Sequence, residues 1–282
     1  MPSSCIWLLI LALPLLQASA PSGTKITIQS GPPGNLSDRT TYTQVDRMRT
    51  EYRNSFGRRH PAEPAYGPHL ARIVRCDLGQ SFELNLDTSE YTSSQYPPKP
   101  LTDEQIKARG LDRMMLPGNP TIRVEIKTTD TGERKEMFGH AARHVITTRT
   151  QTPLDGSKSE LQEMVTDGWY IDFDQQLSCE AKSSKVMRGY ISSYLSVGNG
   201  RHPLEKPEFV KVGEPETGFL MDSTVTSKSP SLHDGTTPSF EMHVTEFAEG
   251  PLDPALFEIP AGFKLVDHID RNPPPATLFN KP

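Results

Sequence analysis

Apolar and polar residues alternate strictly in three segments of the chain, which is the pattern of a β-strand with one buried face. A shorter alternation places Ile26 and Ile28 on one face of a fourth segment. The pattern predicts a meandering antiparallel sheet that carries its apolar side chains on one face. The inward positions in the three longer segments are Phe82, Leu84, Leu86, Ile122, Val124, Ile126, Phe240, Met242 and Val244.

Other segments of the sequence predict further extended stretches and turns. Residues 41–53 form one extended stretch in this prediction, and the β-branched run within residues 138–150 is strongly strand-prone. Asp130-Thr131-Gly132 follows an alternating segment, where glycine can supply the positive φ of a hairpin turn. Asp167-Gly168 indicates a second turn or a bulge inside residues 164–171.

Helix is scarce in the predicted fold. Thr102 and Gln105 have the spacing of a capping box ahead of a short helix that ends at Gly110. Residues 184–197 suit an amphipathic helix, although their Ser and Tyr content also allows a strand. The 26 prolines gather in long loops, and no repeat or domain boundary divides the chain. The predicted fold class is therefore β-rich (α+β), with one domain, a few short helices and long loops.

The N-terminus has the form of an export signal. An apolar run from Ile6 to Leu16 precedes Ala18 and Ala20, which occupy the −3 and −1 positions of a cleavage site. The run is too short to cross a bilayer. We therefore expect residues 1–20 to be a signal peptide and residues 21–282 to form a single secreted or periplasmic domain of the cell envelope.

Net charge, apolar segments and cysteine content limit which partners and which cellular compartment we expect. The formal net charge of −5 argues against a nucleic-acid partner, which needs a basic face. No later apolar segment is long enough to span a membrane. The mature chain keeps Cys76 and Cys179, which in an oxidising compartment favour a disulfide. Such a bridge would close a loop of about 100 residues; two unrelated buried thiols are the alternative.

A search for catalytic motifs finds no nucleophile elbow, Walker loop, dinucleotide fingerprint or metalloprotease signature. His140 and His144 have helical metal-ligand spacing, but the sequence around them favours a strand, where they would lie about 13 Å apart. Asp172 and Asp174 are interpreted as solvent-facing carboxylates. We therefore expect no metal, no cofactor and no enzymatic activity.

Two further features have a structural and a functional interpretation. The charged stretch Asp46–Arg53 suits the solvated face of an ion-paired strand better than an anion-binding patch. Trp169 suits a core position first and the lining of a ligand groove second.

Several short strings follow one another along the chain in a recognisable order. They are Val45–Arg49, Cys76–Leu78 followed by Phe82–Leu86 and Tyr91, Thr131–Lys135 with Phe138–Arg143, Asp167–Asp172 and Leu256–Phe263. Together they resemble the lipoprotein-carrier (LolA-like) superfamily of envelope proteins over roughly residues 24–268. The closing string is close to the ending of an uncharacterised branch of that superfamily and is the most specific.

The resemblance implies an exported protein with a strongly curved antiparallel sheet, a half-barrel, whose relatives hold acyl chains or lipidated proteins in the concave face. On this basis we expect a non-enzymatic binding or carrier protein with a lipid or lipoprotein partner. The inward positions given above, together with Trp169, would line the cavity. An envelope sensor or structural protein with a filled core is the alternative, and a hydrolase with a dispersed Asp, His and Ser site is a second.

Overall fold

The computed structural model describes residues 22–53, 67–99, 101–108, 119–155, 157, 160–174, 177–179, 207–228 and 239–271. The signal segment and the helix expected at residues 184–197 lie outside these ranges. The elements are β1 (Ser22–Gly31), β2 (Ser37–Thr43), β3 (Arg47–Arg53), β4 (His69–Arg75), β5 (Gln80–Asn85), β6 (Glu90–Gln95), α1 (Asp103–Ala108), β7 (Ile122–Met137), β8 (His140–Pro153), β9 (Gln162–Ile171), β10 (Pro207–Val212), β11 (Phe219–Lys228), β12 (Ser239–Pro251), the 3₁₀ helix η2 (Pro254–Phe257) and β13 (Lys264–Leu265).

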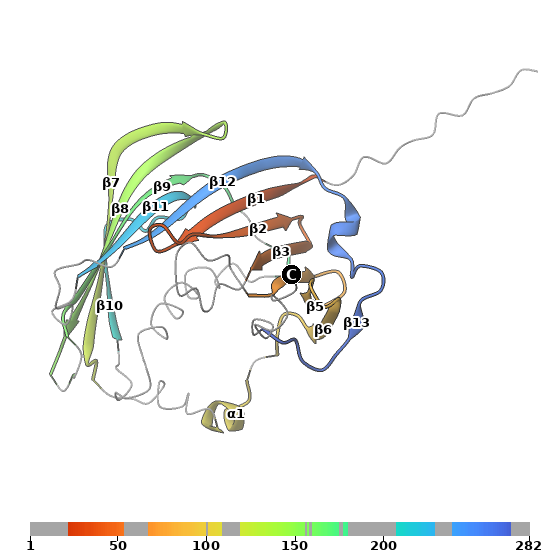
Figure 1. Ribbon diagram of the computed structural model, residues 1–282. Coiled ribbons are helices and arrows are strands. Elements are labelled where there is room, and N and C mark those ends of the chain that lie inside the picture. Colours follow the sequence, from red (N-terminus) through yellow and green to blue (C-terminus); the bar gives the residue numbers. More distant parts are fainter. Residues whose placement is uncertain are drawn as a thin grey trace, which may run out of the picture.

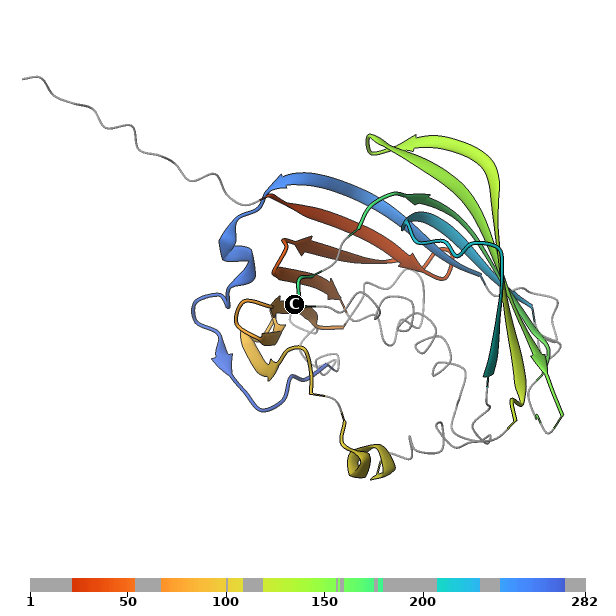
Figure 2. The ribbon, with the colours of Figure 1, turned by 180° about the vertical axis from the view of Figure 1, so that it is seen from behind.

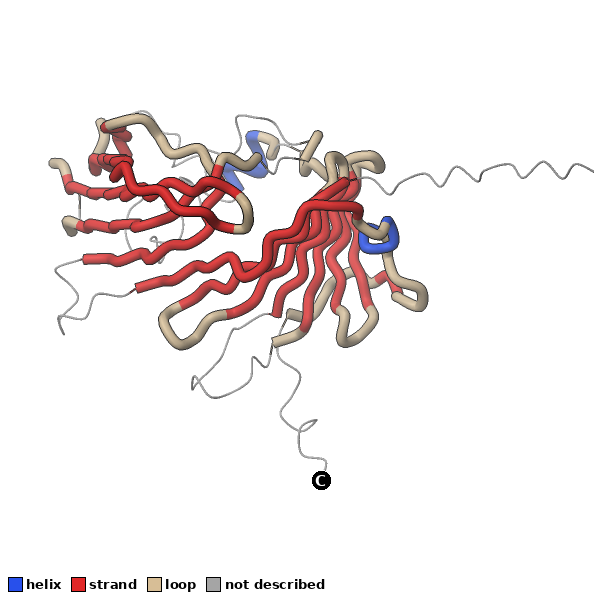
Figure 3. The backbone as a smooth tube through the Cα atoms, turned by 90° about the horizontal axis from the view of Figure 1, so that it is seen from above, coloured by secondary structure: helices blue, strands red, loops and turns tan. Residues whose placement is uncertain are grey.

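The described strands form one strongly curved, open sheet (Figures 1 and 2). Its order is β10-β7-β8-β9-β11-β12-β1-β2-β3-β4-β5-β6-β13. Every neighbouring pair is antiparallel except the two at the edges, β10 with β7 and β13 with β6. Figure 3 shows from above how the strands fan out along the curve. The predicted β-rich half-barrel with few helices is confirmed.

The alternating segments lie in β5, β7 and β12, but two predicted boundaries are wrong. Residues 41–53 are two strands, because the chain turns at residues 44–46, where the Gln44 amide donates to the Arg47 carbonyl. Asp167-Gly168 is not a turn, because β9 runs through it without interruption. The irregularity beside it lies in the partner strand β11, between Leu220 and Asp222. Asp and Gly are depleted in strands, but the pairing of neighbouring strands can override that preference.

The hairpin turn expected at Asp130–Gly132 lies further along the chain. β7 continues to Met137, and the turn is Phe138-Gly139, both with positive φ (51° and 80°). Gly132, with φ of 85°, instead accommodates an irregularity in the register between Asp130 and Arg134. The β7–β8 hairpin therefore extends beyond the rest of the sheet and arches over it (Figure 1).

The capping box is confirmed at the start of α1. The Gln105 amide donates to Thr102 Oγ1 at 3.3 Å, and the Thr102 amide donates to Gln105 Oε1 at 3.0 Å. The two bonds satisfy backbone donors that a helix start leaves open. No helix in the described part of the chain is long and apolar enough to cross a membrane.

The register assigns side chains to the two faces of the sheet. Directly paired residues share a face and successive residues alternate, so Val74 and Ile73 of β4 point to opposite sides. Val74 packs on the concave side with Tyr96, Leu177 and the disulfide. Ile73 packs on the outer side, where Phe263 of the C-terminal segment covers it.

A third cluster lies under the arching hairpin. It joins buried side chains of β1, β8, β9, β11 and β12, including Ile26, Ile171 and Met221. Phe138 and His140 at the hairpin end contact Phe247 of β12, with ring centroids 6.4 and 5.0 Å apart. The hairpin is thus fixed to β12 by aromatic packing.

Two buried arginines hold the C-terminal segment on the outer face. Arg49 donates to the Leu256 carbonyl at 3.1 Å, and Arg75 donates to the Glu258 carboxylate at 2.6 Å. Arg75 also makes a two-pronged contact with Asp77, whose pKa is lowered chiefly by that hydrogen bond. Within the charged stretch, Arg49 is ion-paired with Glu51 but buried, so the interpretation of the stretch as a solvated face is wrong for this residue.

Cys76 and Cys179 form a disulfide, with Cα atoms 5.4 Å apart. It ties the turn after β4 to the segment that follows β9. The bridge therefore fastens one half of the sheet to chain that continues from the other half.

Candidate functional site

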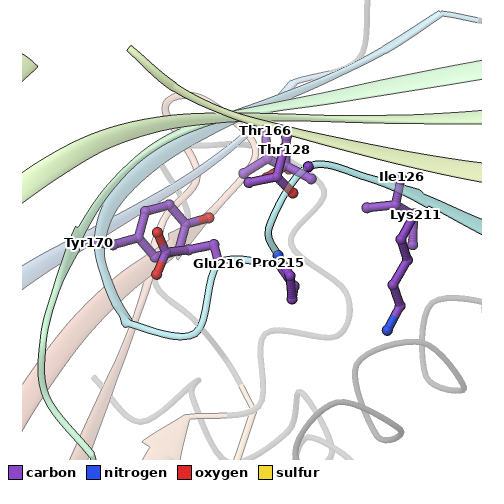
Figure 4. A pocket seen from close by; sticks show the side chains of 9 residues that line it. Ile126, Thr128, Thr166, Tyr170, Lys211, Pro215 and Glu216 are labelled. Atoms are coloured by element: carbon purple, nitrogen blue, oxygen red, sulfur yellow. The ribbon is translucent and has the colours of Figure 1, made fainter. Parts of the chain in front are cut away.

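The strand order forces one connection across the concave face. β10 pairs with the far edge of β7, whereas β11 pairs with β9, so residues 213–218 must pass over β7, β8 and β9. We call residues 213–218 the strap. Figure 4 shows the strap passing close to Tyr170 and Thr128 of the sheet.

A charged clamp holds the strap down. Arg143 of β8 donates from Nε to Glu216 Oε2 at 2.9 Å and from Nη2 to Oε1 at 2.5 Å. The Gly218 amide donates to the same carboxylate, and Arg143 also donates to Asp172. Burial is the largest single influence on Glu216, whose side chain is 10% exposed, and by itself it would raise the pKa. The hydrogen bonds from Arg143 and from the backbone amides, together with the Arg143 charge, outweigh burial and lower that pKa.

The strap and the sheet border a half-open pocket of about 230 Å³. β7, β8 and β9 form its floor, and β10 and the strap form its wall. Figure 4 shows the lining side chains. They belong to Ile126, Thr128, Thr147, Thr166, Tyr170, Lys211, Pro215 and Glu216, with the backbone of Gly213.

Hydroxyl groups dominate the floor of the pocket. Thr128, Thr147 and Thr166 are directly paired across β7, β8 and β9 and so form one row on the concave face. Tyr170 adds a phenol, and its burial, with the nearby Glu216 charge, raises the pKa of the hydroxyl to about 12. The phenol therefore stays protonated at neutral pH and can donate a hydrogen bond.

The fit of the strap depends on Gly213. It has φ of 83°, and a Cβ built on it would lie 2.6 Å from the carbonyl oxygen of Thr128. Gly139 has a similar φ of 80° with nothing within 4 Å of such a Cβ. The two glycines thus differ in available space but not in backbone conformation.

We predict that Gly213→Ala destabilises the fold more than Gly139→Ala does. The control should lose roughly 1 kcal/mol from left-handed strain alone. Gly213→Ala should lose at least about twice that, because the strap must also move away from β7. Urea unfolding of both variants measures the difference, and equal losses would show that the strap does not press on the sheet.

Another polar cluster surrounds His144 on the other face of β8. Its Nε2 lies 2.7 Å from Asp167 and its Nδ1 lies 3.1 Å from the Thr131 hydroxyl. Its ring stacks on Trp169 at 4.8 Å between centroids. This arrangement of a histidine with a carboxylate and a hydroxyl resembles the dispersed hydrolase site, but its hydroxyl comes from a threonine instead of a serine. The cluster fastens the irregular part of β7 to β8 and β9.

The described residues contain no group of three or more His, Cys, Asp or Glu side chains placed to bind a metal. His140 and His144 lie on one strand, and each faces a carboxylate, Glu249 and Asp167 respectively. The strand interpretation of the two histidines is confirmed.

The predicted cavity-lining residues do not form one surface. Ile126 lines the pocket, and Ile122 and Val124 are buried beside it on the same face. Trp169, Met242 and Val244 pack in the cluster under the hairpin, and Phe240 is 45% exposed. Whether these side chains contact a ligand stays a prediction.

The expectation that the first segment faces inward is corrected. Phe82, Leu84 and Leu86 pack with Ile73 and Phe263 on the outer side. Alternation shows which residues share a face but not which way that face points, and here the C-terminal segment buries the outer face.

Sequence reasoning missed the polar residues of the pocket. Thr128 continues the alternation of Ile122, Val124 and Ile126, so its face was predictable. Glu216 and Arg143 had no such signal, because only the strand order brings them together.

No protein-family model and no curated protein matches the chain. One similar solved structure is that of PNGF-II in C2 space group, with 12% identity and a TM-score of 0.31. The match covers 86% of this chain and 30% of that chain, so this chain spans about a third of the length of the structure it matches.

Proposed function

We propose that this chain is an exported, non-enzymatic binding protein that holds its ligand on the concave face of the half-barrel. The observation that carries the proposal is the strap, which Arg143 clamps across β7, β8 and β9 and which borders a half-open pocket. The Cys76–Cys179 disulfide supports export, because disulfides persist in oxidising compartments.

The volume of the pocket limits the size of the group that it can hold. Its volume of about 230 Å³ lies below the range of about 300–1,000 Å³ that encloses drug-sized ligands. A long acyl chain would not fit inside. If the partner is a lipid or a lipidated protein, as the LolA-like resemblance implies, the pocket would receive its polar group.

Native mass spectrometry of mature protein from its own exported pool tests the proposal. We expect a bound species that is released on organic extraction or denaturation. Thr147→Phe should abolish the bound species, because the new ring would occupy the pocket.

Thr148→Phe is the matched control, since Thr148 is the next residue of β8 and points to the opposite face. Its bound species should remain. A bare polypeptide mass for the wild-type protein would contradict the proposal and favour the sensor or structural alternative.

A further inference from the structure

We propose that the pocket binds a neutral, polyhydroxylated molecule about as large as one sugar ring. This inference rests on the proposed function and names the class of ligand for the same pocket. Three independent features of the pocket point to this class: the state of its hydroxyl groups, its charge balance and its volume.

The hydroxyl groups that line the pocket make no hydrogen bond to another described residue. Elsewhere on the sheet, hydroxyls on neighbouring strands bond to each other, as Thr27 and Thr40 do at 3.1 Å and Ser81 and Ser94 do at 2.9 Å. Within the described part of the chain, the hydroxyls of Thr128, Thr147, Thr166 and Tyr170 make no such bond. Each threonine hydroxyl offers one donor and two acceptor sites, and the phenol both donates and accepts.

This row of hydroxyl groups can both donate and accept hydrogen bonds, so it matches a ligand whose groups also do both. The hydroxyls of a polyol do both at every position. An acyl chain does neither, and its burial against the row would leave the threonine hydroxyls without partners, at a cost in affinity.

The charges of the pocket cancel. Among the described lining residues, the charged side chains are the Lys211 ammonium and the Glu216 carboxylate, one of each sign. The Glu216 carboxylate already accepts hydrogen bonds from Arg143 and from the Gly218 amide, and Arg143 also forms an ion pair with Asp172. The described lining thus has no excess of charge of one sign that would favour an ionic ligand.

The volume of the pocket suits a ligand with a single small ring. About 230 Å³ equals the liquid volume of roughly eight water molecules. A single hydroxylated six-membered ring occupies that order of space. The Tyr170 ring lines one side and supplies an apolar surface for the carbon skeleton of such a ring (Figure 4).

Saturation-transfer NMR on the full mature chain tests this inference, with myo-inositol and D-glucose as probes. Acetate, inorganic phosphate and palmitate-containing vesicles are the competing classes. We expect transfer to at least one of the two polyols and none to acetate or phosphate.

Thr147→Val removes one hydroxyl and keeps the shape of the side chain. It should weaken polyol binding about tenfold, the effect of one lost hydrogen bond. Thr148→Val, on the opposite face of the same strand, should leave the affinity unchanged. Equal affinities for the two variants would place the polyol elsewhere and overturn the inference.

The remaining outcomes separate this inference from the proposed function. If vesicle lipid binds and Thr147→Phe blocks it while neither polyol binds, the binding function stands and the polyol class is wrong. If phosphate or acetate binds in place of polyols, the charge argument is wrong. If no probe binds and native spectra show a bare chain, both proposals fail.

Discussion

Removing the Cys76–Cys179 disulfide is expected to lower the free energy of unfolding by about 4 kcal/mol. The two cysteines are 103 residues apart, and a bridge that closes so long a loop removes much of the entropy of the unfolded chain. The bridge also packs against Val74, Tyr96 and Leu177, so its loss weakens a buried cluster. Urea unfolding of the double variant Cys76→Ala/Cys179→Ala measures the change.

The double variant also provides its own control, because reductant should destabilise the wild-type protein and leave the variant unaffected. A loss below about 1 kcal/mol, well under the usual range for a native bridge, would show that the half-barrel is held without it.

Arg143→Gln is expected to cost about 3 kcal/mol. The substitution leaves the Glu216 carboxylate buried without its charged partner, and breaking a largely buried ion pair usually costs this much. Arg134→Gln is the matched control, since Arg134 forms a two-pronged pair with Asp130 that is open to solvent. The control should change stability little, because exposed pairs are screened.

The pH dependence gives the Arg143 prediction a second readout. The pKa of Glu216 lies below its ordinary value of 4.5 in the folded protein, so its stabilising contribution is present above pH 4.5 and lost as the pH falls through the folded pKa. In Arg143→Gln, burial without the arginine should raise that pKa. The penalty of the variant should therefore begin to shrink above pH 4.5, as the pH falls through the raised pKa of the variant, and should go on shrinking until the pH has passed the lowered pKa of the wild type. A penalty that stays constant with pH would mean that Glu216 is not the group left unpaired.

The sequence predicted those elements that depend on residues close together in the chain. Alternation located β5, β7 and β12, and the capping box of Thr102 and Gln105 located α1. Turns were harder, because Gly132 and Gly168 are compatible with both a turn and an irregular strand. The β7–β8 hairpin turns at Phe138-Gly139, where the positive φ of Phe138 is not signalled by the sequence.

The pocket results from the order of the strands in the sheet, and no local sequence pattern predicts it. The pairing of β10 with β7 sends the strap across the sheet, and no periodicity in residues 207–218 predicts a parallel edge strand. The direction of Phe82 and Leu84 likewise depends on Phe263, which is far away in the sequence. Contacts between distant segments thus decide which alternating residues surround a ligand.

The most direct test of a ligand site under the strap is a titration of isotope-labelled protein with the species extracted from the native protein, or with myo-inositol, followed by amide NMR. The amides of Thr128, Thr147 and Thr166 should shift and saturate together, while those of Thr41 and Thr50, on strands outside the pocket, stay in place. Shifts confined to the outer face, around Ile73 and Phe263, would contradict the account.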